Sequence, residues 1–210
     1  MDKPAKLQPG YGLEIAATVL ISLATIVSAW TTYQSVRWSG VQANSYATAI
    51  SLRTESVRYA NQANFLNSID VSMFMNYFAA RSQGNASLTQ FLEQRFRPEF
   101  QPAMAAWLAT RPFTNPDAPT SPFEMPQYRI NDRQTSLRLN AAAEQLQQRA
   151  QAANQTADNY TLMTVLFASV SFLAGVGSQF RKHISRLIFL IAAALVLAGA
   201  IAVILTFPVE

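Results

Sequence analysis

A stripe of polar and small side chains runs along the first apolar segment of this chain. It begins at Glu14, and each following member lies three or four residues further on. That spacing keeps the side chains on one face of a helix. The stripe consists of Glu14, Thr18, Ser22, Thr25, Ala29 and Thr32. In an oligomer, such a face can line a water-filled or ion-conducting path with a carboxylate at its cytoplasmic mouth.

A matching stripe follows the second apolar segment, again at helical spacing. Its members are Thr161, Thr164, Ala168, Ser171, Gly175 and Ser178. Small residues allow two helix backbones to approach closely, and hydroxyl groups can hydrogen-bond across the contact. We therefore favour helix packing over a pore, and we expect the two stripes to be buried against each other.

Arginines stand beside aromatic residues in the middle of the chain. The candidate binding residues there are Arg95, Arg97, Glu99, Trp107 and Arg111. Guanidinium groups next to aromatic rings can bind an anionic ligand or a lipid headgroup. The alternative, which we favour, is an ion pair between one of the first two arginines and Glu93 or Glu99 that anchors a loop.

No catalytic motif accompanies these residues. The chain has no cysteine and a single histidine, His183, which excludes thiolate chemistry and multi-histidine metal sites. G-x-S-x-G, H-E-x-x-H, the phosphate-binding glycine loop and the dinucleotide fingerprint are all absent from the sequence. A basic surface cluster of the kind that binds nucleic acid is missing as well. We expect a protein that is not an enzyme, has no metal or cofactor, and does not bind nucleic acid.

The composition is typical of a membrane protein. Charged residues make up 13% of the 210 residues, against about 25% in an ordinary soluble domain. Residues 15–32, 160–180 and 187–207 are apolar stretches near the roughly 20 residues that a helix needs to cross a bilayer. A cleaved signal peptide is the alternative for the first stretch, because two lysines precede it. The length of that stretch favours a retained span.

The charges next to these stretches indicate their orientation. The loop at residues 181–186 carries three arginine or lysine side chains, and short cationic loops stay in the cytoplasm. Residues 1–14 contain Lys3 and Lys6 and are expected on the same side. Residues 33–159, with 11 Arg against 9 Asp and Glu and no lysine, are then periplasmic or extracellular.

Heptad spacing continues after the first stretch and before the second. The first series is Val36, Gly40, Ala43, Ala47, Ile50, Thr54 and Val57. The second series is Leu139, Ala143, Leu146, Ala150, Ala153, Ala157 and Tyr160. Alternating steps of four and three are typical of a coiled-coil seam. We expect residues 33–66 and 129–159 to form helices of about 45 Å that pair antiparallel as a stalk; the alternative is two unrelated amphipathic helices.

A small helical head is expected at residues 67–128. The apolar residues of positions 69–78 fall all round a helix, which predicts burial on every side. Ser87, with Gln90 three residues later, predicts a capping-box start for the next helix, which holds Leu88, Phe91, Leu92 and Phe96. The prolines that follow predict an irregular loop.

Two segments resemble small uncharacterised bacterial membrane proteins. One extends from Asn159 to Arg181. The other begins at Arg95 and ends at Tyr128, with the sequence RFRPEFQPAMAAWLATRPFTNPDAPTSPFEMPQY. The resemblance covers most of the chain from Trp38 onward. It implies a multi-pass protein of the bacterial inner membrane, and it brings no activity and no site residues.

These patterns together predict an all-α membrane protein with three transmembrane helices, an antiparallel helical stalk and a helical head outside the cytoplasm. The leading hypothesis for its function is a non-enzymatic scaffold or accessory subunit in the lipid bilayer. It would present the head to a membrane-protein partner or to another copy of itself as a homo-oligomer. The second hypothesis is an oligomeric pore lined by the first span. The third is a sensor subunit that signals through a separate membrane partner.

Overall fold

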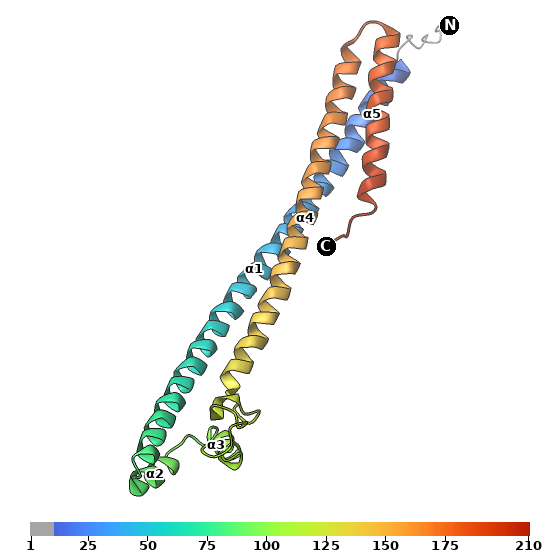
Figure 1. Ribbon diagram of the computed structural model, residues 1–210. Helices are drawn as coiled ribbons and strands as arrows, with labels where there is room; N and C mark the ends of the chain where they lie inside the picture. The colour runs from blue at the N-terminus through green and yellow to red at the C-terminus, as the bar shows by residue number, and fades with distance from the viewer. Residues whose placement is uncertain (1–10) are drawn as a thin grey trace, which may run out of the picture. The chain divides into compact units, whose positions relative to one another are not determined.

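The computed structural model describes residues 11–210, which form helices joined by irregular segments, with no β-strand among them (Figure 1). The elements are α1 (Tyr11–Ser82), α2 (Ala86–Glu93), α3 (Gln101–Ala109), the 3-10 helix η1 (Pro122–Glu124), α4 (Asn131–Gln179) and α5 (His183–Ile204). Helices α1, α4 and α5 are each long and apolar enough to cross a membrane. The prediction of an all-α chain with three such helices is confirmed. The lysines at positions 3 and 6 lie outside the described residues.

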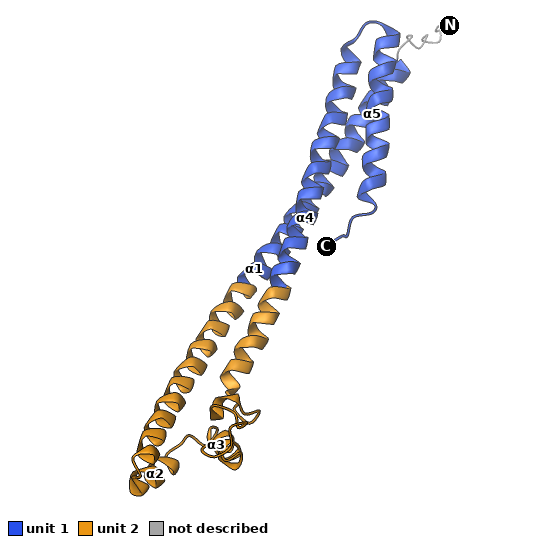
Figure 2. Ribbon diagram, viewed as in Figure 1, with its two compact units in different colours: residues 1–47, 146–210 blue, residues 48–145 orange. Residues whose placement is uncertain are grey.

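The chain divides into two compact units, which Figure 2 shows in different colours. Unit 1 comprises residues 1–47 and 146–210, and unit 2 comprises residues 48–145. Both α1 and α4 contribute a part to each unit, whereas α5 belongs to unit 1 and α2 and α3 belong to unit 2.

The core of unit 1 lies between α1, α4 and α5. Alanines from all three helices alternate there with larger apolar side chains from α4 and α5. The buried members are Ala17, Ala24, Met163, Phe167, Val170, Ala174, Leu190, Ala193, Leu197 and Ala200. Small residues let the helix backbones approach, and the larger side chains fill the remaining space to the density of a protein interior.

A glycine allows α5 to fold back closely onto α4. A Cβ atom placed on Gly177 would lie 2.9 Å from the Cβ atom of Phe189 on α5. That separation is shorter than two carbon atoms tolerate, and neither atom can rotate away. A Cβ atom placed on Gly175, two residues earlier and on nearly the opposite face of α4, would meet no atom of another element within 4 Å.

Hydrogen bonds tie the last residues of the chain to α1 and α4 in unit 1. The carbonyl oxygen of Pro208 accepts from Trp38 Nε1 at 3.1 Å and from the Tyr160 hydroxyl at 3.0 Å. The amide of Gln34 exchanges two hydrogen bonds with the backbone of Glu210, at 3.0 and 3.2 Å. These bonds give buried side-chain polar groups a partner, which an apolar surrounding requires.

Unit 2 has a core that is rich in aromatic residues. Its buried members are Phe74, Tyr77, Ala80, Leu92, Phe96, Phe100, Ala103, Met104 and Trp107. Several rings meet edge to face, as for Phe74 and Trp107 at 5.3 Å between centroids. That arrangement suits the charge distribution of aromatic rings.

The predicted burial of positions 69–78 on every side is wrong. These positions are buried on one face of α1 only, because Met75 and Phe78 are exposed. Of the apolar residues that the predicted second helix holds, Leu88 and Phe91 are exposed on α2, whereas Leu92 and Phe96 are buried.

The turn between α1 and α2 follows Ser82, the last residue of α1. Gly84 has φ +68°, in the left-handed region that favours glycine, and Asn85 N donates to Ala80 O at 3.0 Å. This geometry terminates α1. Asn85 Oδ1 then accepts from Leu88 N at 3.0 Å and caps α2, so the predicted cap at Ser87 is wrong. Asparagine is at least as good an N-cap as serine.

We predict that Gly177→Ala lowers the free energy of unfolding by about 1–3 kcal/mol, because the added methyl group forces α4 and α5 apart. Gly175→Ala is the matched control and should change it by less than about 1 kcal/mol, or stabilise α4 slightly. Thermal unfolding of the full chain in mild detergent, followed by circular dichroism, measures both. Equal losses for the two variants would contradict the close contact at Gly177.

Candidate functional site

Helix α1 carries two seams, which are rows of residues along opposite faces of the helix. The first of them, the inner seam, packs against α4. The members of this inner seam are all buried: Thr31, Gln34, Ser45, Ala49, Ser56 and Ala63. In unit 1, Thr31 Oγ1 lies 2.8 Å from Thr164 Oγ1. In unit 2, Ser56 Oγ donates to the carbonyl oxygen of Ser136 at 2.8 Å. Each unit therefore has α1 and α4 joined by polar bonds across small side chains.

The opposing face of α4 is the one that the heptad spacing predicts. All seven residues of the predicted series from Leu139 to Tyr160 are buried or half-buried. Ala143 and Ala150 are fully covered, the first in unit 2 and the second in unit 1. The predicted series of α4 is therefore covered, each residue within its own unit.

The second seam of α1, here called the outer seam, has no partner in the described chain. Its members are exposed and alternate mostly by four and three: Thr18, Ser22, Thr25, Ala29, Thr32, Val36, Gly40, Ala43, Ala47, Ile50, Thr54 and Val57. Val36 and Ile50 are each 66% exposed. The prediction that residues 36–57 pair with α4 is therefore wrong.

The geometry of a helix explains this error. Members of the outer seam, such as Ala43, lie two positions from members of the inner seam, such as Ser45. Two positions correspond to about 200° around an α-helix, so the two seams occupy nearly opposite faces. Apolar spacing alone favoured the outer seam, because Gln34, Ser45 and Ser56 are polar. Hydrogen bonds make Gln34 and Ser56 suitable for burial.

The hydroxyl groups of the outer seam are satisfied within α1. Thr18, Thr25 and Thr32 each donate to the carbonyl oxygen four residues earlier, at 2.8–2.9 Å. Such bonds let threonine lie in an apolar surrounding without an unpaired donor. Glu14, at the start of the predicted stripe, is exposed and lies 3.7 Å from Arg186 Nη1 on α5.

The predicted stripe of α4 contacts residues of α1 that lie outside the predicted stripe of α1. Thr164 contacts Thr31, and Thr161 Oγ1 lies 2.9 Å from Ser35 Oγ. Neither α1 partner belongs to the predicted stripe, so the predicted mutual burial of the two stripes is wrong. The other members lie at the α4 surface or bond within α4: Ala168, Ser171, Gly175 and Ser178.

A shallow hollow opens on the outer seam in unit 2. It has a volume of about 280 Å³ and is lined by Ile50, Arg53, Thr54 and Val57. Most of the exposed surface inside it is apolar. An apolar hollow between seam residues is the shape that receives a side chain of a facing helix in knobs-into-holes packing.

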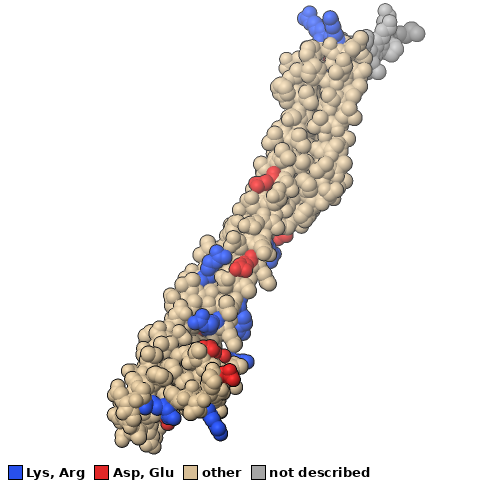
Figure 3. Space-filling view, viewed as in Figure 1, with Lys and Arg blue, Asp and Glu red and all other residues tan. Residues whose placement is uncertain are grey.

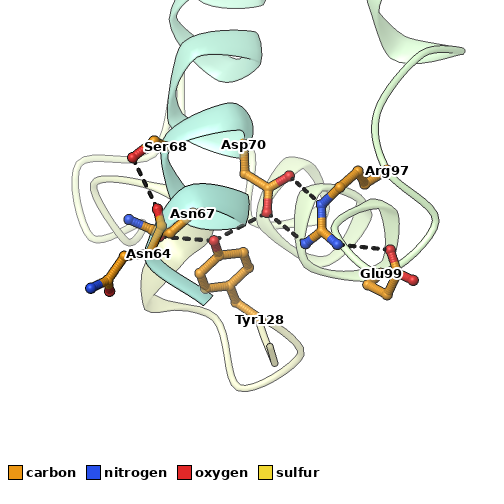
Figure 4. A network of polar contacts seen from close by, with 7 residues as sticks. All are labelled: Asn64, Asn67, Ser68, Asp70, Arg97, Glu99 and Tyr128. Atoms are coloured by element: carbon orange, nitrogen blue, oxygen red, sulfur yellow. Dashed lines mark hydrogen bonds and ion pairs between the residues drawn. The ribbon is translucent and has the colours of Figure 1, made fainter. Parts of the chain in front are cut away.

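A buried carboxylate on α1 holds the segment around Arg97 in unit 2 (Figure 4). Asp70 is 1% exposed and accepts from Arg97 Nε at 3.0 Å and from Nη2 at 2.9 Å. Arg97 Nη1 donates to Glu99 at 3.0 Å. The hydrogen bonds with Asp70 raise the pKa of Arg97. This two-bonded pair is the strongest geometry available to arginine and a carboxylate.

Tyr128 completes the network from the other end of the irregular segment. Its hydroxyl lies 2.9 Å from Asn67 Oδ1 and 3.2 Å from Asp70 Oδ2, so its one proton can be donated to either. Burial, with the charge of Asp70 beside it, raises the pKa of Tyr128. The phenol therefore stays a donor at neutral pH. Asp70 thus binds both Arg97 and Tyr128, and the network is a latch between α1 and the connection from α2 to α4.

The remaining predicted binding residues engage separate partners. Arg95 lies over the ring of Phe91 at 4.5 Å. Trp107 is buried, and its Nε1 donates to Pro119 O at 2.7 Å. Arg111 has φ +54° and lines an open hollow beside α3. Only Arg97 and Glu99 are brought together, as the predicted ion pair.

Asp70 is the important residue that the sequence analysis missed. It is the one charged residue among the largely apolar positions 69–78 of α1. A carboxylate within a buried face requires a positive partner. That isolated charge is the signal that points to it, although nothing in the spacing identifies Arg97 as the partner.

No protein-family model, curated protein or solved structure matches this chain. Its function has to be inferred from its own contacts and surfaces.

We predict that Arg97→Met lowers the stability of unit 2 by about 3–5 kcal/mol, because it leaves the buried carboxylate of Asp70 without a counter-charge. Glu99→Gln removes only the exposed partner and should cost less than about 1 kcal/mol. Amide hydrogen exchange of residues 67–128 in the full chain measures the difference. The double variant Asp70→Asn with Arg97→Met should recover part of the loss. If Arg97→Met exchanges like the wild type, the latch does not hold this segment.

Proposed function

We propose that this chain is a non-enzymatic, multi-pass scaffold or accessory subunit of a membrane, which assembles with a second copy of itself through α1. In this arrangement α1 and α4 extend from the bilayer as an antiparallel stalk, and the residues of unit 2 beyond it form a head outside the cytoplasm. The observation that carries the proposal is the outer seam, which stays exposed from Thr18 to Val57.

The composition of the outer seam supports a helix as its partner. Its members within the apolar part of α1 are small or hydroxyl residues, which transmembrane helices use for close approach. Further along, Val36, Ile50 and Val57 add apolar side chains, whose exposure to water is unfavourable. A surface with both properties on one helix is suited to a partner helix that accompanies it out of the membrane.

The absence of charge along the seam supports a second copy as that partner. Two copies in one membrane share an orientation, so their α1 helices pair in parallel and identical residues face each other. Like charges in such positions repel. None of the seam residues from Thr18 to Val57 is charged, so this repulsion is limited to flanking residues such as Arg53, which lines the hollow.

Aromatic and basic residues support the orientation of the proposal. Trp38 and Tyr160 meet Pro208 at one end of the apolar helices of unit 1, and such amphipathic rings favour a membrane interface. Arg181 and Lys182 lie at the opposite end, in the turn between α4 and α5, where Figure 3 shows positive side chains. We place that turn in the cytoplasm. The resemblance noted in the sequence suggests a bacterial inner membrane.

An oligomeric pore lined by α1 is the second candidate. The exposed hydroxyls of Thr18, Ser22 and Thr25 favour it, since they form a polar face on an apolar helix. Against it, the two threonine hydroxyls already donate within α1. Ion flux in liposomes that changes on Glu14→Gln would favour the pore, whereas a chain that passes no ions would leave self-assembly as the function.

We predict that the turn between α4 and α5 faces the cytoplasm. The chain has no cysteine, so a single introduced thiol reports one position. A thiol reagent that cannot cross the inner membrane should label Asn115→Cys in intact cells and label Ser185→Cys only after the membrane is opened. Labelling of Ser185→Cys in intact cells would show that the orientation is inverted.

We predict that the outer seam joins two copies. Under mild oxidation in membranes, Ala43→Cys should form covalent dimers, because a disulfide needs Cα atoms about 4–7 Å apart. Asn44→Cys, exposed on α1 and about 100° round the helix from Ala43, is the matched control and should form several-fold fewer dimers.

A second substitution tests the same contact without a disulfide. Gly40→Leu should reduce cross-linking of Ala43→Cys, since a Cβ at Gly40 meets no atom of its own chain within 4 Å and the bulk is felt only by a partner. Equal cross-linking at both cysteine positions, or no effect of Gly40→Leu, would contradict assembly through this seam.

A further inference from the structure

Arg186, in the first turn of α5, is a buried cation with too few partners. It is 9% exposed, and its Nε and Nη2 atoms have no hydrogen-bond acceptor among the described residues. Its remaining contact is the ion pair from Nη1 to Glu14 at 3.7 Å. The side chain of Glu14 is 65% exposed. The guanidinium is thus buried, while its counter-charge is largely in solvent.

A buried guanidinium with unused donors needs an additional hydrogen-bond acceptor. Arginine stays charged at all relevant pH values and carries five N–H donors in a fixed fork. A buried charge without hydrogen bonds is strongly unfavourable, and at 3.7 Å the contact with Glu14 is too long for a good hydrogen bond. A group with several negative oxygens that replaced or joined Glu14 would satisfy these donors.

Other positive groups lie at the same end of α5. The helix begins after Lys182, which makes no side-chain capping bond, and its first turn has no acidic residue. The first backbone N–H groups of a helix carry partial positive charge and favour an anion. Arg181 and Lys182 are exposed next to this terminus.

We propose that Arg186 and the amino-terminal turn of α5 form a binding site for one phosphate group, supplied by an anionic phospholipid of the adjacent leaflet. The planar fork of arginine matches two phosphate oxygens, and Arg181 and Lys182 attract the negative headgroup. Glu14 is the acidic side chain in contact with Arg186 from α1, and it moves into solvent when the phosphate binds. The site requires that unit 1 lies in a membrane, and it is independent of self-assembly.

Lipid retention by the purified full chain tests the site. The chain is reconstituted with phosphatidylglycerol or phosphatidylcholine, and bound lipid is counted by native mass spectrometry. Wild type should retain phosphatidylglycerol in preference to phosphatidylcholine. Arg186→Gln should lose at least about tenfold in retention, because charge-assisted hydrogen bonds are removed. Arg149→Gln, an exposed arginine on α4, is the matched control and should retain it like wild type.

Two further variants separate binding from folding. Arg186→Lys keeps the charge without the fork and should give an intermediate loss. Glu14→Gln removes the competing carboxylate and should increase phosphatidylglycerol retention, whereas a purely structural ion pair would make Glu14→Gln lose stability and lipid together. Circular dichroism establishes that each variant is folded.

The source of the phosphate is distinguished by competition. If millimolar inorganic phosphate leaves the lipid bound, the ligand is the headgroup. If it releases the lipid from wild type, the same site takes a soluble phosphate. Retention of phosphatidylglycerol by folded Arg186→Gln at the wild-type level would overturn the proposal, as would equal retention of phosphatidylcholine.

Discussion

Close approach of helices over small side chains is the constraint on which the rest of this structure depends. Helices that cross a bilayer gain little from hydrophobic burial against each other, because lipid is equally apolar. They gain from dispersion contacts, which require backbones to come near. In unit 1 the contacts are made by alanines of α1, α4 and α5 and by Gly177. In unit 2, Ala63 and Ala143 are fully buried on α1 and α4.

Polar residues fix the register of these helix contacts, because apolar residues alone would allow one helix to shift along the other. The pairs Thr31 with Thr164 and Ser56 with Ser136 are specific to one register within their own units. The latch of Asp70 with Arg97 and Tyr128 does the same for the irregular connection in unit 2. A buried ion pair is weak as a source of stability but costly to break. Such pairs therefore act by excluding alternative packings.

What these contacts leave uncovered is as informative as what they bury. The chain buries the residues of the inner seam of α1 and leaves the residues of the outer seam of the same helix exposed. It also leaves Arg186 with unused donors at the end of α5. At the first place side chains stay exposed, and at the second hydrogen-bond donors stay without an acceptor among the described residues. One is neutral and small, which suits a helix; the other is cationic and local, which suits an anionic headgroup.

The sequence by itself determined the helical class, the three apolar helices, the buried face of α4 and an ion pair within the segment from Glu93 to Glu99. Each depends on local spacing or on neighbours in the chain. Only the tertiary structure decided which of two opposite faces of α1 meets α4, because hydrogen bonds to distant residues make polar side chains suitable for burial. It likewise decided that Asp70 partners Arg97 and that Glu14 meets Arg186. Pairings between residues far apart in the chain depend on where the chain returns, and periodicity along one helix carries no such information.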